Sequence, residues 1–396
     1  MSTIQSFPKR MVRNHPAYRA MNESTSLPSS HSLPPVYRGM MALGACCLVL
    51  AVGTGVWRIA LMRGFVLPPV PEWWPPHGHW MVGGFLGGLI MFERMIALQI
   101  GRLAWVPYAY MLSAVFLHTG WPAVRVIHLL ALAGWIAHRW IAYRTFHKYE
   151  KPLVESVAYI TLSSALNYPG GLMADPVVAL AALSFPAATI VVERLEMSLS
   201  FQKIGAKIAL WMLIAWCVLW GLTAWFRVAP LPWMGALTLL VAAGSIRYDM
   251  SLWAKGSAGP LHRFLQRTLA VAYAWLILAA MAMIGSSYLP GAVMKDVLFH
   301  LMGLGFIFTM ILAHAPLILP AAIGKLPPVS APAVPFVAFQ LVTAVRILAD
   351  LCVAKWTAPW MWTGWTSGIL HLALFIVYVA LVFRSSRPIE HQPAVS

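Results

Sequence analysis

Histidine is the residue type whose placement along this sequence most clearly suggests chemistry. Neutral imidazole is a common ligand for copper and for haem iron, and imidazoles from separate helices at one depth of a membrane can form such a site. For any single histidine, a hydrogen bond between helices is the more ordinary role, above all for His118 and His128, whereas the set as a whole favours a ligand site. Six of the thirteen histidines fall at the predicted outer side of the chain: His77, His79, His118, His128, His300 and His371.

Three of these histidines open apolar segments and are the strongest ligand candidates. His77 and His79 begin one segment, and His300 stands near the start of another. We predict that these three bind a metal or haem, with His371 and His128 as further cofactor-binding candidates. The five histidines together predict one cofactor site near the outer surface of the membrane.

His314 is the residue that raises the question of a second haem. It follows His300 by fourteen residues, which returns it to nearly the same helix face about 21 Å further along. Two stacked haems would need a second helix with a matching pair, and His128 and His138 are ten residues apart and point to different faces. His314 is therefore left for a second ligand, a proton path or packing.

Charged residues inside apolar segments form a second pattern. A Glu-Arg dipeptide occurs at 93–94 and again at 193–194, and an arginine and an aspartate stand four residues apart at 346 and 350, on one helix face. Because an unpaired charge in a membrane costs several kcal/mol, we predict that these residues are structural ion pairs. Asp296 lies one turn before His300, where it could orient the imidazole or simply begin a helix. The predicted ion-pair residues are Glu93, Arg94, Glu193, Arg194, Arg346 and Asp350.

Several kinds of chemistry have no residues to carry them. The four cysteines lie in apolar runs without a CxxC or CxxCH spacing, which excludes a disulfide framework, a thiolate zinc site and covalent haem attachment. The sequence also contains no phosphate-binding glycine loop and no HExxH motif. ATP-driven transport and metalloproteolysis are therefore not expected.

The composition shows what kind of elements must position these side chains. Of 396 residues, 60% are hydrophobic and only 10% are charged, whereas a soluble domain is about a quarter charged. A membrane span needs about 20 mostly apolar residues. The chain is therefore predicted to be a polytopic membrane protein whose main partner is the lipid bilayer, and the net charge of +16 is attributed to basic loops rather than to nucleic-acid binding.

The apolar runs predict an all-α bundle of about twelve transmembrane helices. Long continuous runs favour helices over barrel strands, which would be about 10 residues long and strictly alternating. We predict a disordered basic arm over 1–38, the membrane domain over 39–384 and a tail over 385–396. The predicted spans lie near 39–62, 78–100, 103–119, 122–143, 152–170, 176–198, 204–226, 230–247, 263–289, 293–323, 329–353 and 364–384.

The basic residues predict the orientation of the bundle. Lys and Arg concentrate in the N-terminal arm, in the tail and in the links 139–151, 194–207 and 247–267, while the alternate links carry few. Positive loops stay on the cytoplasmic side. Both termini are therefore expected in the cytoplasm of a bacterial inner membrane, with the histidines near the periplasmic face.

The order of motifs resembles the NnrS family of bacterial inner-membrane haem and copper proteins linked to nitric oxide metabolism. The resemblance runs from the second to the twelfth span and depends on His77-Gly78-His79 followed by glycines, and on a late span with His300, Gly303, Gly305, Thr309 and Met310. Trp80 stands where that family has an acid. The resemblance implies that His77, His79 and His300 are haem or copper ligands.

The leading hypothesis is an inner-membrane protein that binds haem b, copper or both, and that handles a diatomic gas such as nitric oxide or exchanges electrons with a redox partner. Whether it is an enzyme is left open, because no free coordination position beside a proton donor can be identified. Two alternatives remain. One is a secondary transporter with a central cavity lined by Glu93, Glu193, Arg346 and Asp350, and the other is a non-catalytic membrane subunit of a respiratory complex.

Overall fold

The computed structural model describes most of residues 35–388. The segments outside the description are 1–34, 63, 99–102, 104, 145–149, 169–171, 173–174, 201–203, 227–230, 254–258, 289–290, 354–360 and 389–396. Most of the predicted arm and the end of the predicted tail therefore lie outside the described residues. The first helix starts at Pro35 instead of residue 39.

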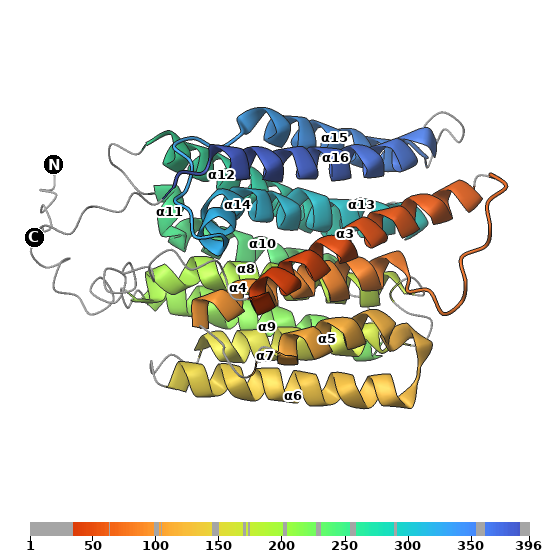
Figure 1. Cartoon of the computed structure of the whole chain (residues 1–396), viewed down its shortest axis with the longest axis horizontal. Coiled ribbons are helices and arrows are strands. Elements are labelled where there is room, and N and C mark those ends of the chain that lie inside the picture. The colour runs from red at the N-terminus through yellow and green to blue at the C-terminus, as the bar shows by residue number, and fades with distance from the viewer. Residues whose placement is uncertain are drawn as a thin grey trace, which may run out of the picture.

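Each predicted apolar segment contains helix, and the long helices run side by side along the length of the molecule (Figure 1). The first half consists of α3 (Pro35–Met62), η1 (His79–Leu86), α4 (Gly87–Leu98), α5 (Trp105–Phe116), η2 (Leu117–Thr119), α6 (Pro122–Arg144), α7 (Glu150–Leu166) and α8 (Pro176–Ser200). The second half consists of α9 (Ile204–Phe226), α10 (Leu231–Tyr248), α11 (Met250–Trp253), α12 (Pro260–Ile284), η3 (Ser286–Tyr288), α13 (Gly291–His300), η4 (Leu301–Phe308), α14 (Thr309–Ala322), α15 (Ala333–Val353) and α16 (Met361–Ser385). The described residues contain no β-strand, only one isolated bridge between Leu326 and Arg387.

Eight helical segments of the described chain are long and apolar enough to cross a membrane. They comprise α3, α6, α8, α9, α12, the continuous α13–η4–α14, α15 and α16. The other four predicted spans correspond to η1–α4, α5, α7 and α10, which are helical but are not among the eight. The chain is thus a multi-pass helical membrane protein, and its apolar helices are compatible with contact to lipid.

Helix α8 forms the centre of the bundle. In its most apolar stretch, 78% of the residues are buried inside the protein, against 22% for α16 at the periphery. Small side chains explain this position, because Ala181, Ala182 and Ala188 let neighbouring helices approach closely. The hydroxyl of Ser184 donates to the carbonyl of Ala181 (2.6 Å), so it remains satisfied in an apolar core.

Two eight-residue π-helices interrupt the bundle, η1 and η4. Such segments are rare and occur frequently at functional sites. Each begins at or directly after a predicted ligand, His79 for η1 and His300 for η4. The two π-helices meet through the stacked rings of Phe85 and Phe308, whose centroids are 5.7 Å apart.

The glycines of η1–α4 serve close helix packing. A Cβ atom at Gly84 would lie 2.9 Å from the sulfur of Cys47 on α3, and one at Gly88 would collide with Met111 on α5. Both contacts are closer than side-chain carbons tolerate. The glycines therefore bring α3 and α5 against the helix that carries His77 and His79.

The start of α3 and the end of α4 lie at the same end of the bundle, because the hydroxyl of Tyr37 donates to the carbonyl of Met95 (3.4 Å). His77 stands at the beginning of the helix that leads into α4. The histidines at 77 and 79 and the Glu93-Arg94 dipeptide therefore lie toward opposite ends of one helix, about 20 Å apart.

Candidate functional site

His77 is fixed by the helix before it. Its Nδ1 lies 2.6 Å from the carbonyl oxygen of Ala51 on α3, and its ring packs where Gly55 leaves space. A carbonyl only accepts hydrogen bonds, so Nδ1 carries the proton and Nε2 carries a lone pair. No other described residue hydrogen-bonds to this ring, which leaves Nε2 as a possible ligand atom.

His300 is fixed in the same way by a carboxylate. Its Nδ1 donates to Asp350 Oδ2 (2.7 Å) on α15, and Asp350 Oδ1 accepts from Arg346 Nε (3.1 Å). Arg346 and Asp350 thus form the ion pair that their spacing predicts. Gly364 on α16 gives the guanidinium room, since a Cβ there would lie 2.6 Å from Arg346 Nη1. The His300 side chain is 24% exposed, and its Nε2 has no partner among the described residues.

These two imidazoles share one electrostatic environment. His77 lies within range of the charges of His300, Arg58 and Arg346, and Asp296 lies within range of His300 and Asp350. A ligating histidine commonly donates its second N–H to a carbonyl or a carboxylate, which fixes the ring and its tautomer. The structure therefore gives His77 and His300 the second-sphere contacts typical of metal-ligating histidines.

His79 lies in a different environment from His77. Its side chain is fully buried, its Nε2 is 3.2 Å from the carbonyl of Leu166 at the end of α7, and its ring lies 5.5 Å from the ring of His118. Residues two apart on a helix do not face one another. The three predicted ligands His77, His79 and His300 are therefore divided between two places.

The other two predicted cofactor residues have hydrogen bonds at both ring nitrogens. His128 lies between Ser113 and Ser163, at 3.1 and 2.9 Å. His371 contacts the carbonyl of Ser367 (2.7 Å) and the hydroxyl of Thr343 (2.9 Å). Histidines with both ring nitrogens hydrogen-bonded in this way hold neighbouring helices together and leave no nitrogen for a ligand. His371 nevertheless lies close enough to His300 for their charges to interact.

The part of the chain that the structure describes contains no group of three or more His, Cys, Asp or Glu side chains that could hold a metal ion. A site built from His77 and His300 would therefore supply two imidazoles. Two imidazoles from the protein would be sufficient to hold haem, since the porphyrin supplies the other donors.

The opposite end of the bundle holds a buried ion-pair network. Arg94 on α4 contacts Glu193 on α8 and Glu155 on α7, the latter at 3.3 Å. Arg139 on α6 binds Glu155 through two hydrogen bonds of 2.7 and 3.0 Å. Arg94 of the first Glu-Arg dipeptide therefore pairs with Glu193 of the second. The network connects four helices, α4, α6, α7 and α8.

Two members of this network, Glu155 and Arg139, are not indicated by the sequence pattern. The distribution of Lys and Arg places Arg139 in the basic link 139–151. Both are almost fully buried in the structure. A glutamate one turn after the start of an apolar run is the only signal that could have suggested Glu155.

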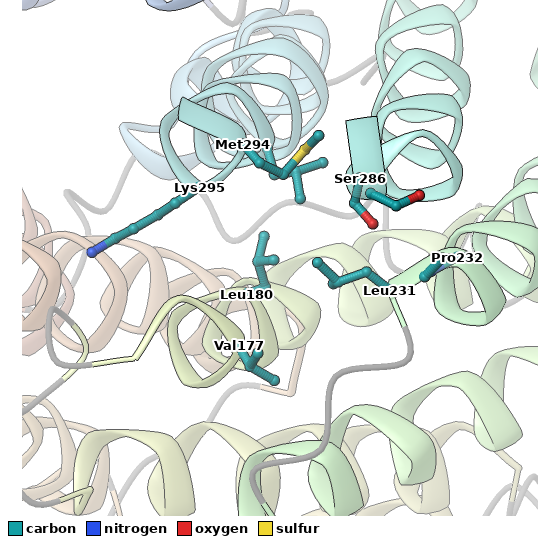
Figure 2. Close-up of a pocket in the computed structure, with 9 residues that line it drawn as sticks. Val177, Leu180, Leu231, Pro232, Ser286, Met294 and Lys295 are labelled. Carbon is teal, nitrogen blue, oxygen red and sulfur yellow. The ribbon is translucent and has the colours of Figure 1, made fainter. Parts of the chain in front are cut away.

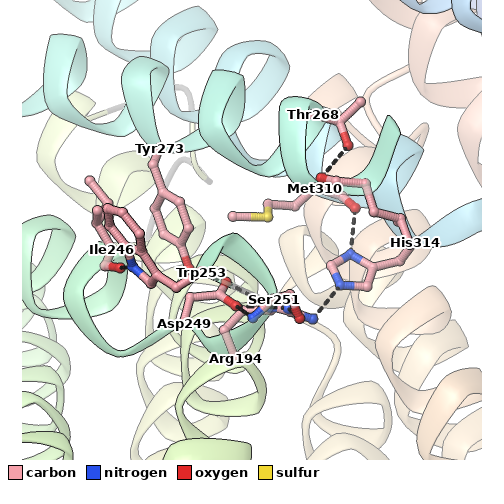
Figure 3. A network of polar contacts seen from close by, with 10 residues as sticks. Arg194, Ile246, Asp249, Ser251, Trp253, Thr268, Tyr273, Met310 and His314 are labelled. Atoms are coloured by element: carbon pink, nitrogen blue, oxygen red, sulfur yellow. Dashed lines mark hydrogen bonds and ion pairs between the residues drawn. The ribbon is translucent and has the colours of Figure 1, made fainter. Parts of the chain in front are cut away.

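Arg194 continues the polar network toward the second half of the chain (Figure 3). It binds both carboxylate oxygens of Asp249 at 2.9 Å and the hydroxyl of Ser251 at 2.5 Å. Its Nη1 lies 3.1 Å from Nε2 of His314, whose Nδ1 donates to the carbonyl of Met310 (2.7 Å). His314 is thereby committed to this network, not to the site of His77 and His300.

A mostly apolar cavity of about 260 Å³ lies between α8, α10, η3 and α13 (Figure 2). Val177, Leu180, Leu231 and Met294 supply much of its wall, and Figure 2 shows the amine of Lys295 directed away from these side chains. None of the four charged residues expected to line a transport cavity borders it.

The fold and its charged clusters define a multi-pass, all-helical membrane protein. No curated protein and no solved structure matches the chain. The chain belongs to the family described as a domain of unknown function (DUF8744), whose model matches residues 38–384. This range covers all the candidate site residues described in this subsection.

Proposed function

We propose that this chain is a haem b protein of the bacterial inner membrane, in which His77 and His300 provide the two iron ligands. One observation carries the proposal: both imidazoles have Nδ1 bound to a fixed acceptor and Nε2 left without a described partner. The resemblance to the NnrS family implies His77 and His300 as ligands, together with His79, and so supports the assignment of these two.

The chemistry of the donors fits haem iron. The carbonyl of Ala51 and the carboxylate of Asp350 hold the two rings in the tautomer that presents Nε2. The Asp350 carboxylate also increases the electron donation of the His300 ring. Bound haem would supply one-electron redox chemistry, with a potential set by these two ligands and by burial.

His77 and His300 would hold the haem between two imidazoles, and a group held by two protein ligands favours electron exchange with a redox partner over catalysis. Of the two, His300 is the more accessible to a diatomic gas such as nitric oxide, because its side chain is 24% exposed. Copper is the alternative occupant of this pair, and metal analysis of the purified protein distinguishes it from haem.

The topology that goes with this proposal has twelve spans and both termini in the cytoplasm. Its support is the concentration of Lys and Arg in alternate links and the helices found in all twelve predicted segments. In this orientation the His77–His300 pair is near the periplasmic face, and the Arg94 network is near the cytoplasmic face.

The transporter hypothesis is weaker for a structural reason. Its four cavity residues separate into two networks, with Glu193 bound to Arg94 and Asp350 bound to Arg346. A non-catalytic subunit remains compatible with the fold, and it is distinguished by the absence of a reducible chromophore in the isolated chain.

An absorption spectrum of the detergent-purified full chain tests the proposal. We expect Soret and α bands that shift on reduction, and we expect H77A and H300A each to lose most of the bound haem. His262 on α12 provides the matched control, so H262A should retain the spectrum. Full haem content in both H77A and H300A, or a colourless wild-type protein, would overturn the proposal.

A further inference from the structure

Arg58 is a positive charge on the face of α3 that packs against His77. The carbonyl of Ala51 accepts a hydrogen bond from the His77 ring, and a Cβ at Gly55 would lie 3.0 Å from Nδ1 of the same ring. Positions 51, 55 and 58 follow the i, i+4, i+7 spacing, so they lie on one face of the helix. Arg58 is therefore on the side of α3 that faces His77, about one turn closer to the C-terminal end of the helix.

The electrostatic surroundings of the histidines place the guanidinium in the same region. Its charge acts on the rings of His77, His79 and His118. These rings lie at one end of the bundle, and Arg58 itself is half-buried. The guanidinium therefore lies at the edge of the histidine cluster.

Arg58 has no anionic partner within the part of the chain that the structure describes. Arg346 binds Asp350, whereas the described residues form no side-chain hydrogen bond or ion pair with Arg58. Glu72 is exposed in the loop after α3, and the structure describes no ion pair between the two. An ionisable group inside a membrane protein is costly without a partner and is a functional candidate by default. The guanidinium therefore calls for an anion from outside the described residues.

We propose that Arg58 binds a propionate carboxylate of the haem held by His77 and His300. The inference rests on the proposed function, in which that haem is bound. Haem b carries two propionates that are ionised at neutral pH, and a guanidinium binds a carboxylate through two parallel hydrogen bonds. Arg346 is already committed to Asp350, so Arg58 supplies this contact.

A lipid phosphate is the other anion that an arginine near the end of a membrane helix could meet. The position of Arg58 favours the propionate, because its face of α3 is turned toward His77 and not toward lipid. Esterification distinguishes the two anions, since it removes the charge of the propionates and leaves the lipid unchanged.

The test is titration of the haem-free full chain in detergent with haem b and, separately, with its dimethyl ester, followed by Soret absorbance. Wild-type protein should bind haem b about 10–100-fold more tightly than the ester, because a hydrogen-bonded charge pair is lost in the ester. R58Q should bind haem b more weakly by a similar factor and should no longer distinguish it from the ester. R38Q is the matched control, because Arg38 is exposed near the opposite end of the same helix, and it should behave like wild type.

If R58Q does not fold, R58K provides the test. It keeps the charge but loses the paired hydrogen bonds, so its preference for haem b over the ester should be smaller than that of wild type. A wild-type protein that binds both ligands equally, a variant at Arg58 that keeps the full preference, or the same loss of preference in R38Q would overturn this inference alone. A wild-type protein that binds neither ligand would overturn the proposed function as well.

Discussion

The two ends of the bundle use charged side chains in opposite ways. In the network around Glu155, the acidic and basic groups contact one another directly, and the side chains of Arg139 and Glu155 are 1% and 2% exposed. In the cluster around Asp350, the carboxylate is shared between His300 and Arg346, and the imidazole keeps one nitrogen without a described partner. A network in which every charged group has a partner of opposite charge stabilises helix packing. A cluster that includes an imidazole nitrogen without a partner can also bind a metal ion or a cofactor.

This difference separates structural from functional residues more clearly than residue type does. Both ends contain arginine–carboxylate pairs inside helices of a membrane protein. Among the residues that the structure describes at these two ends, an imidazole held by a carboxylate occurs at the Asp350 end. The comparison predicts that substitutions at the Glu155 end affect folding, while substitutions at the Asp350 end affect ligand binding.

The largest expected effect comes from E155Q. This change leaves Arg94 and Arg139 buried without the carboxylate that both contact. Removing one partner of a buried ion pair costs about 3–5 kcal/mol. We expect a strongly lowered midpoint of thermal unfolding in detergent and a poor yield. A midpoint within experimental error of the wild-type value would contradict the structural role of this network.

D249N should have a smaller effect of the same kind. Arg194 loses a bidentate carboxylate partner but keeps contacts to Ser251 and His314. A hydrogen bond to a charged group contributes about 1.5–3 kcal/mol, and we expect a loss in that range. Thermal unfolding measures it, and S251A, which removes only a neutral partner, is the control that should lose less.

D350N tests the functional end. The amide leaves the His300 ring less firmly held, and we expect haem affinity to fall by about 10–100-fold. The loss of stability should be smaller than in E155Q, because one arginine instead of two contacts this carboxylate. Because the carboxylate increases electron donation to the iron, its removal should also raise the midpoint potential. A redox titration measures the shift. A midpoint potential equal to that of the wild-type protein, or a loss of stability as large as that of E155Q, would contradict the claim that the Asp350 end serves ligand binding and the Glu155 end serves folding.

R346Q should produce the smallest effect. Arg346 contacts Asp350 but not His300, so it acts on the ligand only through the carboxylate. We expect a change in midpoint potential opposite in direction to that of D350N and of smaller size, because the carboxylate without its arginine accepts more strongly from His300. A larger shift than in D350N would mean that Arg346 acts on the bound group directly.

The sequence predicted the helical elements well, because long apolar runs leave the backbone few other ways to satisfy its hydrogen bonds in lipid. It also predicted the pairing of Arg346 with Asp350, which is local. The count of twelve spans stays a prediction, since η1–α4, α5, α7 and α10 are not among the eight helical segments that qualify by length and composition.

The long-range pairings were not predictable from the sequence. Nothing local brings Glu155 to Arg94, or Asp249 to Arg194, because these contacts depend on how four or more helices pack. The separation of His79 from His77 could have been anticipated from helix geometry, since residues two apart face different neighbours. The two π-helices leave no pattern that distinguishes them from ordinary helix.

Electron paramagnetic resonance of the oxidised, detergent-purified protein tests the central claim most directly. If His77 and His300 both bind the iron, the spectrum will show a low-spin ferric haem with two imidazole ligands, and H77A or H300A will convert any remaining haem to a high-spin form. A high-spin wild-type spectrum, or a low-spin signal that survives in both variants, would contradict the assignment.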